Sequence, residues 1–131
     1  MKADLVRALV TVTAVFELAL GLTLLFLPEE LAGLLFPAQP PPETTFTGLL
    51  AATLIAHGVM SWIGRNAVLG GIYGRAIVSA HQVHFLIGTL ILVERSLGPS
   101  PSPLLLALTA FYAAAALFCG NLLFSKADLG G

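Results

Sequence analysis

Long stretches without charge are the feature that most constrains this chain. Between Arg7 and Glu29 the only charged residue is Glu17, and three further runs carry no charge at all: 44–64, 76–93 and 96–125. Each run is close to the ~20 residues that a helix needs to cross ~30 Å of hydrocarbon. Backbone groups in lipid must pair within the segment, which favours helices. We therefore predict an all-α membrane bundle with four spanning helices, at about residues 4–27, 44–65, 72–94 and 102–125.

The composition excludes most alternatives to a membrane protein. Only 10% of the 131 residues are charged, against about a quarter in soluble domains. The net charge of −1 argues against a nucleic-acid partner, which requires a basic face. We expect a single domain, 1–131, whose main surroundings are the lipid bilayer. Cys119 is the single cysteine, so no disulfide can form within the chain.

The connections between the spans also carry structural signals. The first run is too long for a signal peptide and ends in LFLPEE without a cleavage pattern, so we expect it to remain as a helix. Leu31, Leu34 and Leu35 recur at helical spacing, and they predict a short interfacial helix over 29–36. The prolines at 37 and 40–42 then impose an extended connector. A second proline-rich stretch, 96–103, separates the last two spans.

Basic residues predict the orientation in the membrane. With an even number of spans both termini lie on one side, which collects Lys2, Arg7, Arg65, Arg75 and Lys126. The opposite side has Arg95 and the acidic residues Glu29, Glu30, Glu43 and Glu94. Because basic loops stay in the cytoplasm, both termini are predicted to face the cytoplasm. We expect Trp62, Arg65 and Arg75 to anchor the helices at the membrane interface.

A polar layer is predicted inside the spans. Its ionisable members are Glu17, His57, His81 and His84, and such groups usually face the bundle interior and mark functional sites. At ~1.5 Å per residue from the cytoplasmic helix ends, their depths are about 14, 10, 8 and 12 Å in that order. Ser61 and Gln82 are expected to join this layer. The small and polar residues that share these faces form four stripes: Thr13-Glu17-Gly21, Thr53-His57-Ser61-Gly64, Ile77-His81-His84-Gly88 and Thr109-Tyr112-Ala113-Ala116-Gly120.

Three interpretations of this layer remain open. In the first, the polar groups form a hydrogen-bonded core that fixes the helix register. In the second, His57 with His81 or His84 ligates a haem or a chlorin, because neutral imidazole is a good ligand for iron, zinc, copper or chlorin magnesium. In the third, Glu17 and a histidine carry protons or a small solute. The His-x-x-His spacing indicates a shared face and no particular ligand, and we assign no residue to a free metal ion.

Two passages resemble a known group of membrane proteins. The first span contains FELALGLTLLFLPEEL, and the second ends in SWIGRNA before a short loop and RAI. These passages resemble the small four-helix bacterial membrane proteins of the broad DoxX-like type, which are largely uncharacterised. The resemblance implies an inner-membrane bundle with both termini inside. Some members of that group are small subunits of quinone or sulfur redox complexes, and the histidines of this chain are not part of their pattern.

The sequence favours a structural or accessory membrane subunit over an enzyme. It contains no Ser-His-Asp pattern, no glycine-rich phosphate loop and no Cys-x-x-Cys, so we assign no catalytic residue. Small residues on the last span offer two surfaces for helix contact: Ala107-Ala110-Ala114 and Ala113-Ala116-Gly120. We therefore expect a homo-oligomer or a place in a larger membrane complex. A haem- or chlorin-binding subunit and a small proton or solute transporter are the alternatives.

Overall fold

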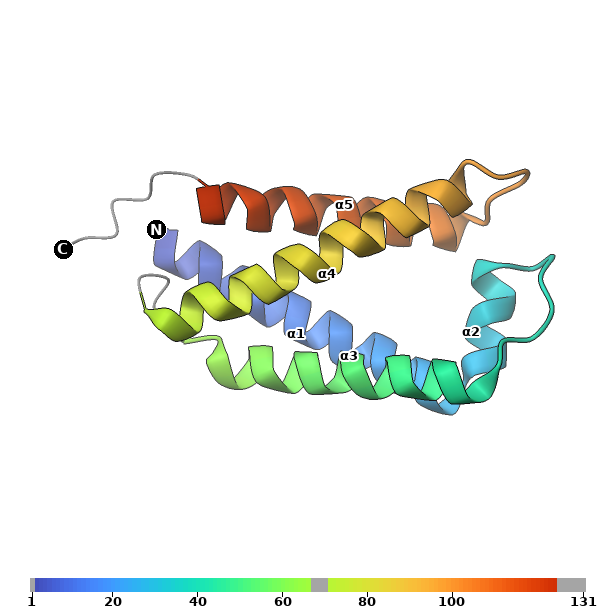
Figure 1. Ribbon diagram of the computed structural model, residues 1–131, viewed down its shortest axis with the longest axis horizontal. Coiled ribbons are helices and arrows are strands. Elements are labelled where there is room, and N and C mark those ends of the chain that lie inside the picture. The colour runs from blue at the N-terminus through green and yellow to red at the C-terminus, as the bar shows by residue number, and fades with distance from the viewer. Residues whose placement is uncertain (1, 67–70, 125–131) are drawn as a thin grey trace.

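A computed structural model shows an all-helical bundle and describes residues 2–66 and 71–124 (Figure 1). The helices over these residues are α1 (Lys2–Phe26), α2 (Pro28–Leu35), α3 (Thr44–Gly64), α4 (Ile72–Ser96) and α5 (Pro103–Phe124). All but the short α2 are long and apolar enough to cross a membrane, so the chain has the fold of a multi-pass membrane protein. The predicted spans agree with these helices to within two residues. Residues 67–70, residue 125 and Lys126 lie outside the described residues.

Local sequence explains several helix ends. Pro28 stands in the first turn of α2, where a missing N–H costs nothing. The carboxylate of Glu43 caps α3 by accepting from the N–H groups of Thr45 at 3.0 Å and Phe46 at 2.9 Å. At the start of α5, the Ser102 hydroxyl accepts from Leu105 N–H at 3.1 Å and donates to the Leu35 carbonyl at 3.0 Å. This last bond ties α2, the predicted short helix, to α5. Its position at the membrane interface stays a prediction.

The four long helices are packed as two close pairs, α1 with α3 and α4 with α5. Gly21 of α1 and Gly58 of α3 allow the first close approach. A Cβ on Gly21 would lie 3.0 Å from the carbonyl oxygen of Ala51, and one on Gly58 would lie 3.0 Å from that of Ala14. Only a residue without a side chain fits at either place. Small residues therefore set the α1–α3 distance, as is common between membrane helices.

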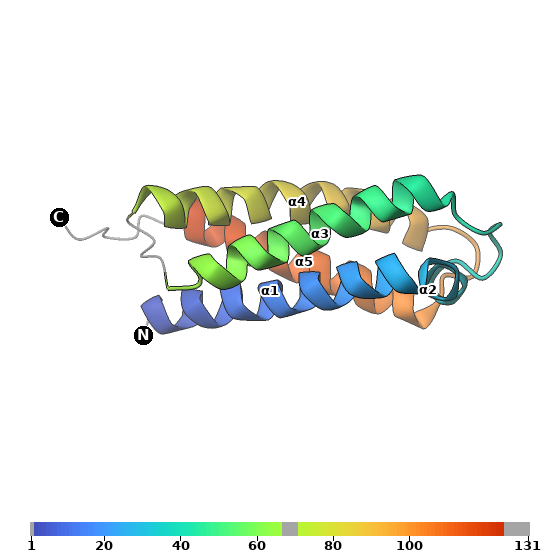
Figure 2. The same cartoon turned by 90° about the horizontal axis from the view of Figure 1, so that it is seen from below.

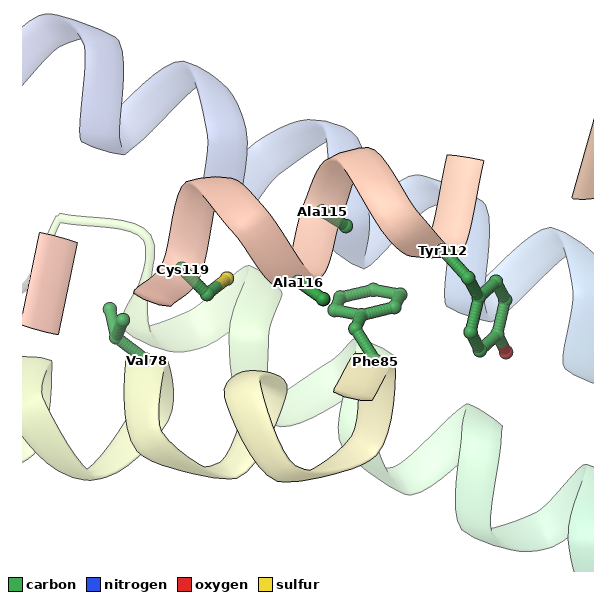
Figure 3. Packing of buried hydrophobic residues seen from close by; sticks show 6 residues of the cluster. All are labelled: Val78, Phe85, Tyr112, Ala115, Ala116 and Cys119. Atoms are coloured by element: carbon green, nitrogen blue, oxygen red, sulfur yellow. The ribbon is translucent and has the colours of Figure 1, made fainter. Parts of the chain in front are cut away.

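Large side chains fill the space between the two pairs. Phe16 of α1 packs on Phe111 of α5 with ring centroids 4.1 Å apart. Phe16 also meets Tyr112 of α5 edge to face, at 6.1 Å between centroids. Within the α4–α5 pair, Figure 3 shows Phe85 of α4 pointing toward α5, between Ala116 and Tyr112, while Val78 faces Cys119. The two pairs are thus joined by side-chain contacts over a greater backbone separation than exists within either pair.

The two ends of the bundle differ in charge. The start of α1, the end of α3, the start of α4 and the end of α5 lie together, at the left of Figure 1 and again in Figure 2. Arg7, Arg65 and Arg75 belong to this end. The opposite end carries α2 and the acidic residues predicted for it: Glu29, Glu30, Glu43 and Glu94. The outer surface between the ends is covered by exposed leucine, isoleucine, valine and phenylalanine side chains, as a lipid-facing surface requires.

The predicted inward stripes are largely buried, with one exception. Thr13, Glu17 and Ser61 are buried, and His81 is 2% exposed. Thr53 is exposed, and its hydroxyl donates to the Leu49 carbonyl of its own helix at 2.9 Å. The expectation that Thr53 faces the interior is therefore wrong. Its hydroxyl proton is satisfied locally, so the side chain can face lipid without a partner from another helix.

Candidate functional site

Glu17 lies at the centre of the polar layer. Its side chain is 0% exposed, and its two oxygens face histidines of two other helices. Oε1 lies 3.0 Å from Nδ1 of His57 on α3, and Oε2 lies 3.4 Å from Nε2 of His81 on α4. Since α1 and α3 form one helix pair and α4 belongs to the other, this group connects the two pairs. Three of the four ionisable residues expected to share a layer therefore lie together.

The two imidazole rings are stacked beside the carboxylate. The centroids of His57 and His81 are 4.5 Å apart, with an angle of 24° between the rings. Because each ring has a nitrogen next to an oxygen of Glu17, both rings present a nitrogen-bearing edge to the same carboxylate. The ring of His81 also stacks with Phe85, at 5.7 Å between centroids. These contacts fix the ring orientations in an apolar surrounding.

The hydrogen bonds of His81 define where its proton lies. Nδ1 is 2.9 Å from the carbonyl oxygen of Ile77, and a carbonyl can only accept, so Nδ1 carries a hydrogen. In a neutral ring, Nε2 then has a lone pair. That nitrogen faces Oε2 of Glu17 at 3.4 Å, which also offers lone pairs. Two acceptors at this distance require a positive species between them, either a proton or a metal ion.

Ser61 reinforces this requirement. Its hydroxyl donates to the His57 carbonyl at 2.8 Å and lies 3.2 Å from Nε2 of His81. A hydroxyl has one hydrogen, so Ser61 cannot serve both contacts as donor. The side chain is fully buried. Ser61 was expected to be part of the polar layer, and the structure places it directly on the nitrogen that faces Glu17.

Glu17, His57 and His81 form a group with the geometry of a metal site. One possible ligand atom from each residue lies within 4.8 Å of those of the other two. Among the described residues, neither oxygen of Glu17 accepts a well-oriented hydrogen bond, although both are close to imidazole nitrogens. A buried carboxylate normally has its acceptor capacity satisfied. The arrangement can therefore bind a cation, either a proton shared with the rings or a metal ion.

His84 lies beside this group and has another partner. Its Nε2 is 3.1 Å from the hydroxyl of Tyr112 on α5. The ring meets His57 edge to face at 5.6 Å between centroids, and it also contacts Phe85 at 5.2 Å. His84 therefore connects the Glu17 group to the aromatic core. Tyr112 was predicted to face the interior, but its role as the partner of His84 could not be read from one helix alone.

Gln82 does not belong to the group around Glu17. Its side-chain amide lies against Gly120 of α5, where an added Cβ would be 3.4 Å from Oε1. Within residues 2–66 and 71–124, this buried Oε1 has no hydrogen-bond partner. One residue along a helix turns the side chain by about 100°, so Gln82 cannot point in the direction of His81. The expectation that Gln82 joins the Glu17 layer is wrong for this reason.

A haem or chlorin does not fit the histidines as they stand. Two axial ligands of one macrocycle must approach its metal from opposite faces. His57 and His81 are instead stacked at 4.5 Å, and the ring of His84 meets that of His57 at 5.6 Å. Neither pair leaves room for a macrocycle between the rings. These histidine pairs therefore do not suit a porphyrin-type cofactor.

The predicted interface residues lie at the basic end of the bundle. Trp62 is exposed, and the guanidinium of Arg65 lies 4.2 Å from the centre of its ring and donates to the Trp62 carbonyl. Arg75, at the start of α4, is exposed. This cation–π contact holds the Trp62 ring close to a positive charge. Tryptophan and arginine side chains are typical of the depth at which the lipid head groups lie.

No protein-family model, no curated protein and no solved structure matches this chain. The resemblance to the DoxX-like group therefore stays a prediction.

Proposed function

We propose that this chain is a small structural or accessory membrane subunit, in contact with a second copy of itself or with a larger membrane complex. The observation that carries the proposal is the outer face of α5. Ala107, Ala110 and Ala114 are exposed on that face, whereas Ala116 on the other face is buried. Small residues three or four positions apart allow another helix to approach closely. The inner small-residue face already packs within the chain, and the outer one is available.

In this function the group around Glu17 holds the two helix pairs together. Glu17 and His57 belong to the α1–α3 pair, and His81 belongs to the α4–α5 pair. A polar connection between the pairs fixes their register and so the shape of the outer surface. The subunit is proposed to act by contact, without a catalytic step of its own.

The proposed setting is a bacterial inner membrane, with both termini in the cytoplasm. Support comes from charge, because Arg7, Arg65 and Arg75 gather at one end of the bundle and four glutamates lie at the other: Glu29, Glu30, Glu43 and Glu94. The positive-inside rule assigns the basic end to the cytoplasm. The short helix α2 then lies on the opposite side, and we propose that it rests in the membrane interface. Membership of the DoxX-like group is part of the same proposal.

Disulfide cross-linking in native membranes tests the outer face of α5. The variant Ala110→Cys is made in a Cys119→Ala background, since Cys119 is the single cysteine of the chain and is buried. We expect oxidation to give a dimer of the chain or an adduct with one partner protein. Leu90→Cys on α4 is the matched control, because Leu90 is 65% exposed and also lies about two turns from the acidic end.

Cross-linking and extraction each have one result that supports the proposal and one that contradicts it. A product formed by Ala110→Cys and absent from Leu90→Cys supports the proposal. Mild detergent extraction of the tagged chain should yield the same partner or a dimer. A chain that forms no specific product and is extracted as a monomer without a partner overturns it.

A further inference from the structure

We propose that Glu17, His57 and His81 form a binding site for one divalent first-row transition-metal ion within the membrane-spanning part of the bundle. The ligands would be the carboxylate of Glu17, Nδ1 of His57 and Nε2 of His81. The proposal goes beyond the accessory role and does not depend on it. It also departs from the sequence interpretation, in which no residue binds a free metal ion.

The distances between the ligand atoms suit a metal ion. In a tetrahedral zinc site with bonds of about 2.1 Å, neighbouring ligand atoms lie about 3.4 Å apart. The two nitrogen–oxygen distances here are 3.0 and 3.4 Å, and the ligand atoms of all three residues fall within 4.8 Å of one another. Small side-chain adjustments are therefore enough to enclose an ion. Three protein ligands leave a fourth position for water.

The hydrogen bonds around His81 prepare its nitrogen for a metal. Metal-binding histidines usually donate their second N–H to a backbone carbonyl or a carboxylate, which fixes the tautomer. His81 has this arrangement, since Nδ1 faces the Ile77 carbonyl at 2.9 Å. The lone pair of Nε2 is thereby directed at Glu17, and a metal ion between them would replace the repulsion of two acceptors by two bonds.

The burial and charge of Glu17 point to a cation. The carboxylate is 0% exposed, and its oxygens have no well-oriented hydrogen bond among the described residues. A buried carboxylate in the membrane is costly unless it is paired or binds a metal. Its ion-pair partners in the described structure are two imidazoles, which are neutral unless protonated. One divalent ion would balance the charge of Glu17 and use both rings as neutral ligands.

The types of ligand define the class of ion. Imidazole suits zinc, iron, copper and nickel, whereas magnesium and calcium prefer sites made of oxygen alone. Two histidines with one carboxylate occur with zinc and with iron(II). We therefore expect excess magnesium or calcium not to displace the bound ion.

Zinc binding to the purified full-length protein tests the site. The chain is purified in detergent through an affinity tag without histidines, treated with EDTA, loaded with ZnCl₂ and desalted. We expect about one zinc ion per chain by elemental analysis. Loss of an outer-shell partner alone lowers metal affinity by about 10- to 100-fold. Each of Glu17→Gln, His57→Gln and His81→Gln removes a ligand, so each should lower zinc affinity by at least about 100-fold.

His84→Gln is the matched control. His84 lies one turn from His81 on the same helix, but its Nε2 contacts Tyr112, so zinc binding should be unchanged. Wild-type protein that binds no zinc overturns the proposal. Zinc loss in His84→Gln equal to that in the ligand variants also overturns it, because another set of ligands would then be responsible.

Cobalt(II) binding tests the site in the wild-type protein, so the result does not depend on whether a variant folds. Wild-type protein loaded with CoCl₂ should show the strong visible bands of a four-coordinate ion with nitrogen and oxygen ligands, and ZnCl₂ should abolish them. The weak spectrum of octahedral, water-bound cobalt would contradict the site. If zinc and cobalt do not bind, the cross-linking result for α5 is not affected. The metal-site proposal and the accessory-subunit proposal can therefore fail separately.

Discussion

Gly58 of α3 lies directly against the backbone of Ala14 in α1, so that a Cβ added to Gly58 would be 3.0 Å from the Ala14 carbonyl oxygen. The backbone of the partner helix cannot yield as a flexible side chain would. Gly21 meets Ala51 in the same way from the other helix. These reciprocal contacts bring α1 and α3 into close packing and place Glu17 beside His57.

The first prediction follows from this contact. Gly58→Ala should lower the free energy of unfolding by about 1 kcal/mol, since overpacking costs about 1–3 kcal/mol and the gain in helix propensity is smaller. Gly48→Ala on the same helix meets nothing within 4 Å, and it should be neutral or stabilising. Unfolding by SDS in mixed micelles measures both. Equal stabilisation by the two variants would contradict the contact.

Glu17→Ala should destabilise the bundle by about 3 kcal/mol, because it removes the shared partner of the buried His81 and the partly buried His57. Adding His81→Ala should cost less than the sum of the single variants, since the two residues act on one group. Thr13→Val is the control on the same stripe. The Thr13 hydroxyl shares its one hydrogen within α1, between the carbonyls of Leu9 and Val10, so its loss should cost less than about 1 kcal/mol. Additive effects of Glu17 and His81 would count against their contact.

The hydrogen bond between His84 and Tyr112 can be measured by a double-mutant cycle. Combining Tyr112→Phe with His84→Gln should give a coupling energy of about 0.6 kcal/mol, which is typical for polar pairs between membrane helices. The ring of Tyr112 would keep its packing against Phe85 in the phenylalanine variant. Tyr73→Phe, at an 82% exposed position of α4, serves as the control and should change nothing. A coupling energy of zero would mean that the bond has no energetic weight.

The cap of α3 predicts a dependence on pH. Backbone N–H groups of Phe46 and Thr45 hold the pKa of Glu43 below its ordinary value of 4.5. Because the folded-state pKa is depressed, the stabilisation by the carboxylate is fully present above about pH 4.5 and is lost as the pH falls through the lowered pKa. Glu43→Ala should therefore lower the thermal midpoint at pH 7 and have a smaller effect at the lowest accessible pH. Glu94→Gln, at an exposed site near the end of α4, should not show this difference.

The helices of this chain could be predicted because a membrane span needs a certain length and apolar character, and both lie within one continuous segment of the sequence. The run 44–64 coincides with α3, and Glu43 and the proline connector mark its start. The short helix after Pro28 was also foreseen from the spacing of its leucines. The pairing of α1 with α3 and of α4 with α5 was not predicted. It depends on which residues of two helices meet, as Gly58 meets Ala14 and Gly21 meets Ala51, and a single helix does not carry that information.

The sequence predicted which residues belong to the candidate site, but it predicted only some of the contacts between them. Similar depth in the membrane placed Glu17, His57, His81 and His84 in one layer, and the first three do lie together. His84 also lies three residues from His81, yet this spacing leaves about 60° between the two side chains around the helix. That angle is enough to direct His81 at Glu17 and His84 at Tyr112. Spacing within one helix defines a face, and the neighbouring helices decide which partner each side of that face meets.

The division of the bundle into two helix pairs has a consequence for how the chain is made. During synthesis α1 enters the membrane first, and Glu17 then lacks both partners, at a cost of a few kcal/mol for an acidic residue in a spanning helix. His57 enters the membrane with α3, which packs directly on α1, and it is the first partner that Glu17 gains. His81 follows with the α4–α5 hairpin, and the packing of this hairpin on the first pair brings His81 next to Glu17. The order of the helices along the chain thus brings the partners of Glu17 into the membrane one after the other, and the last hairpin completes the polar core.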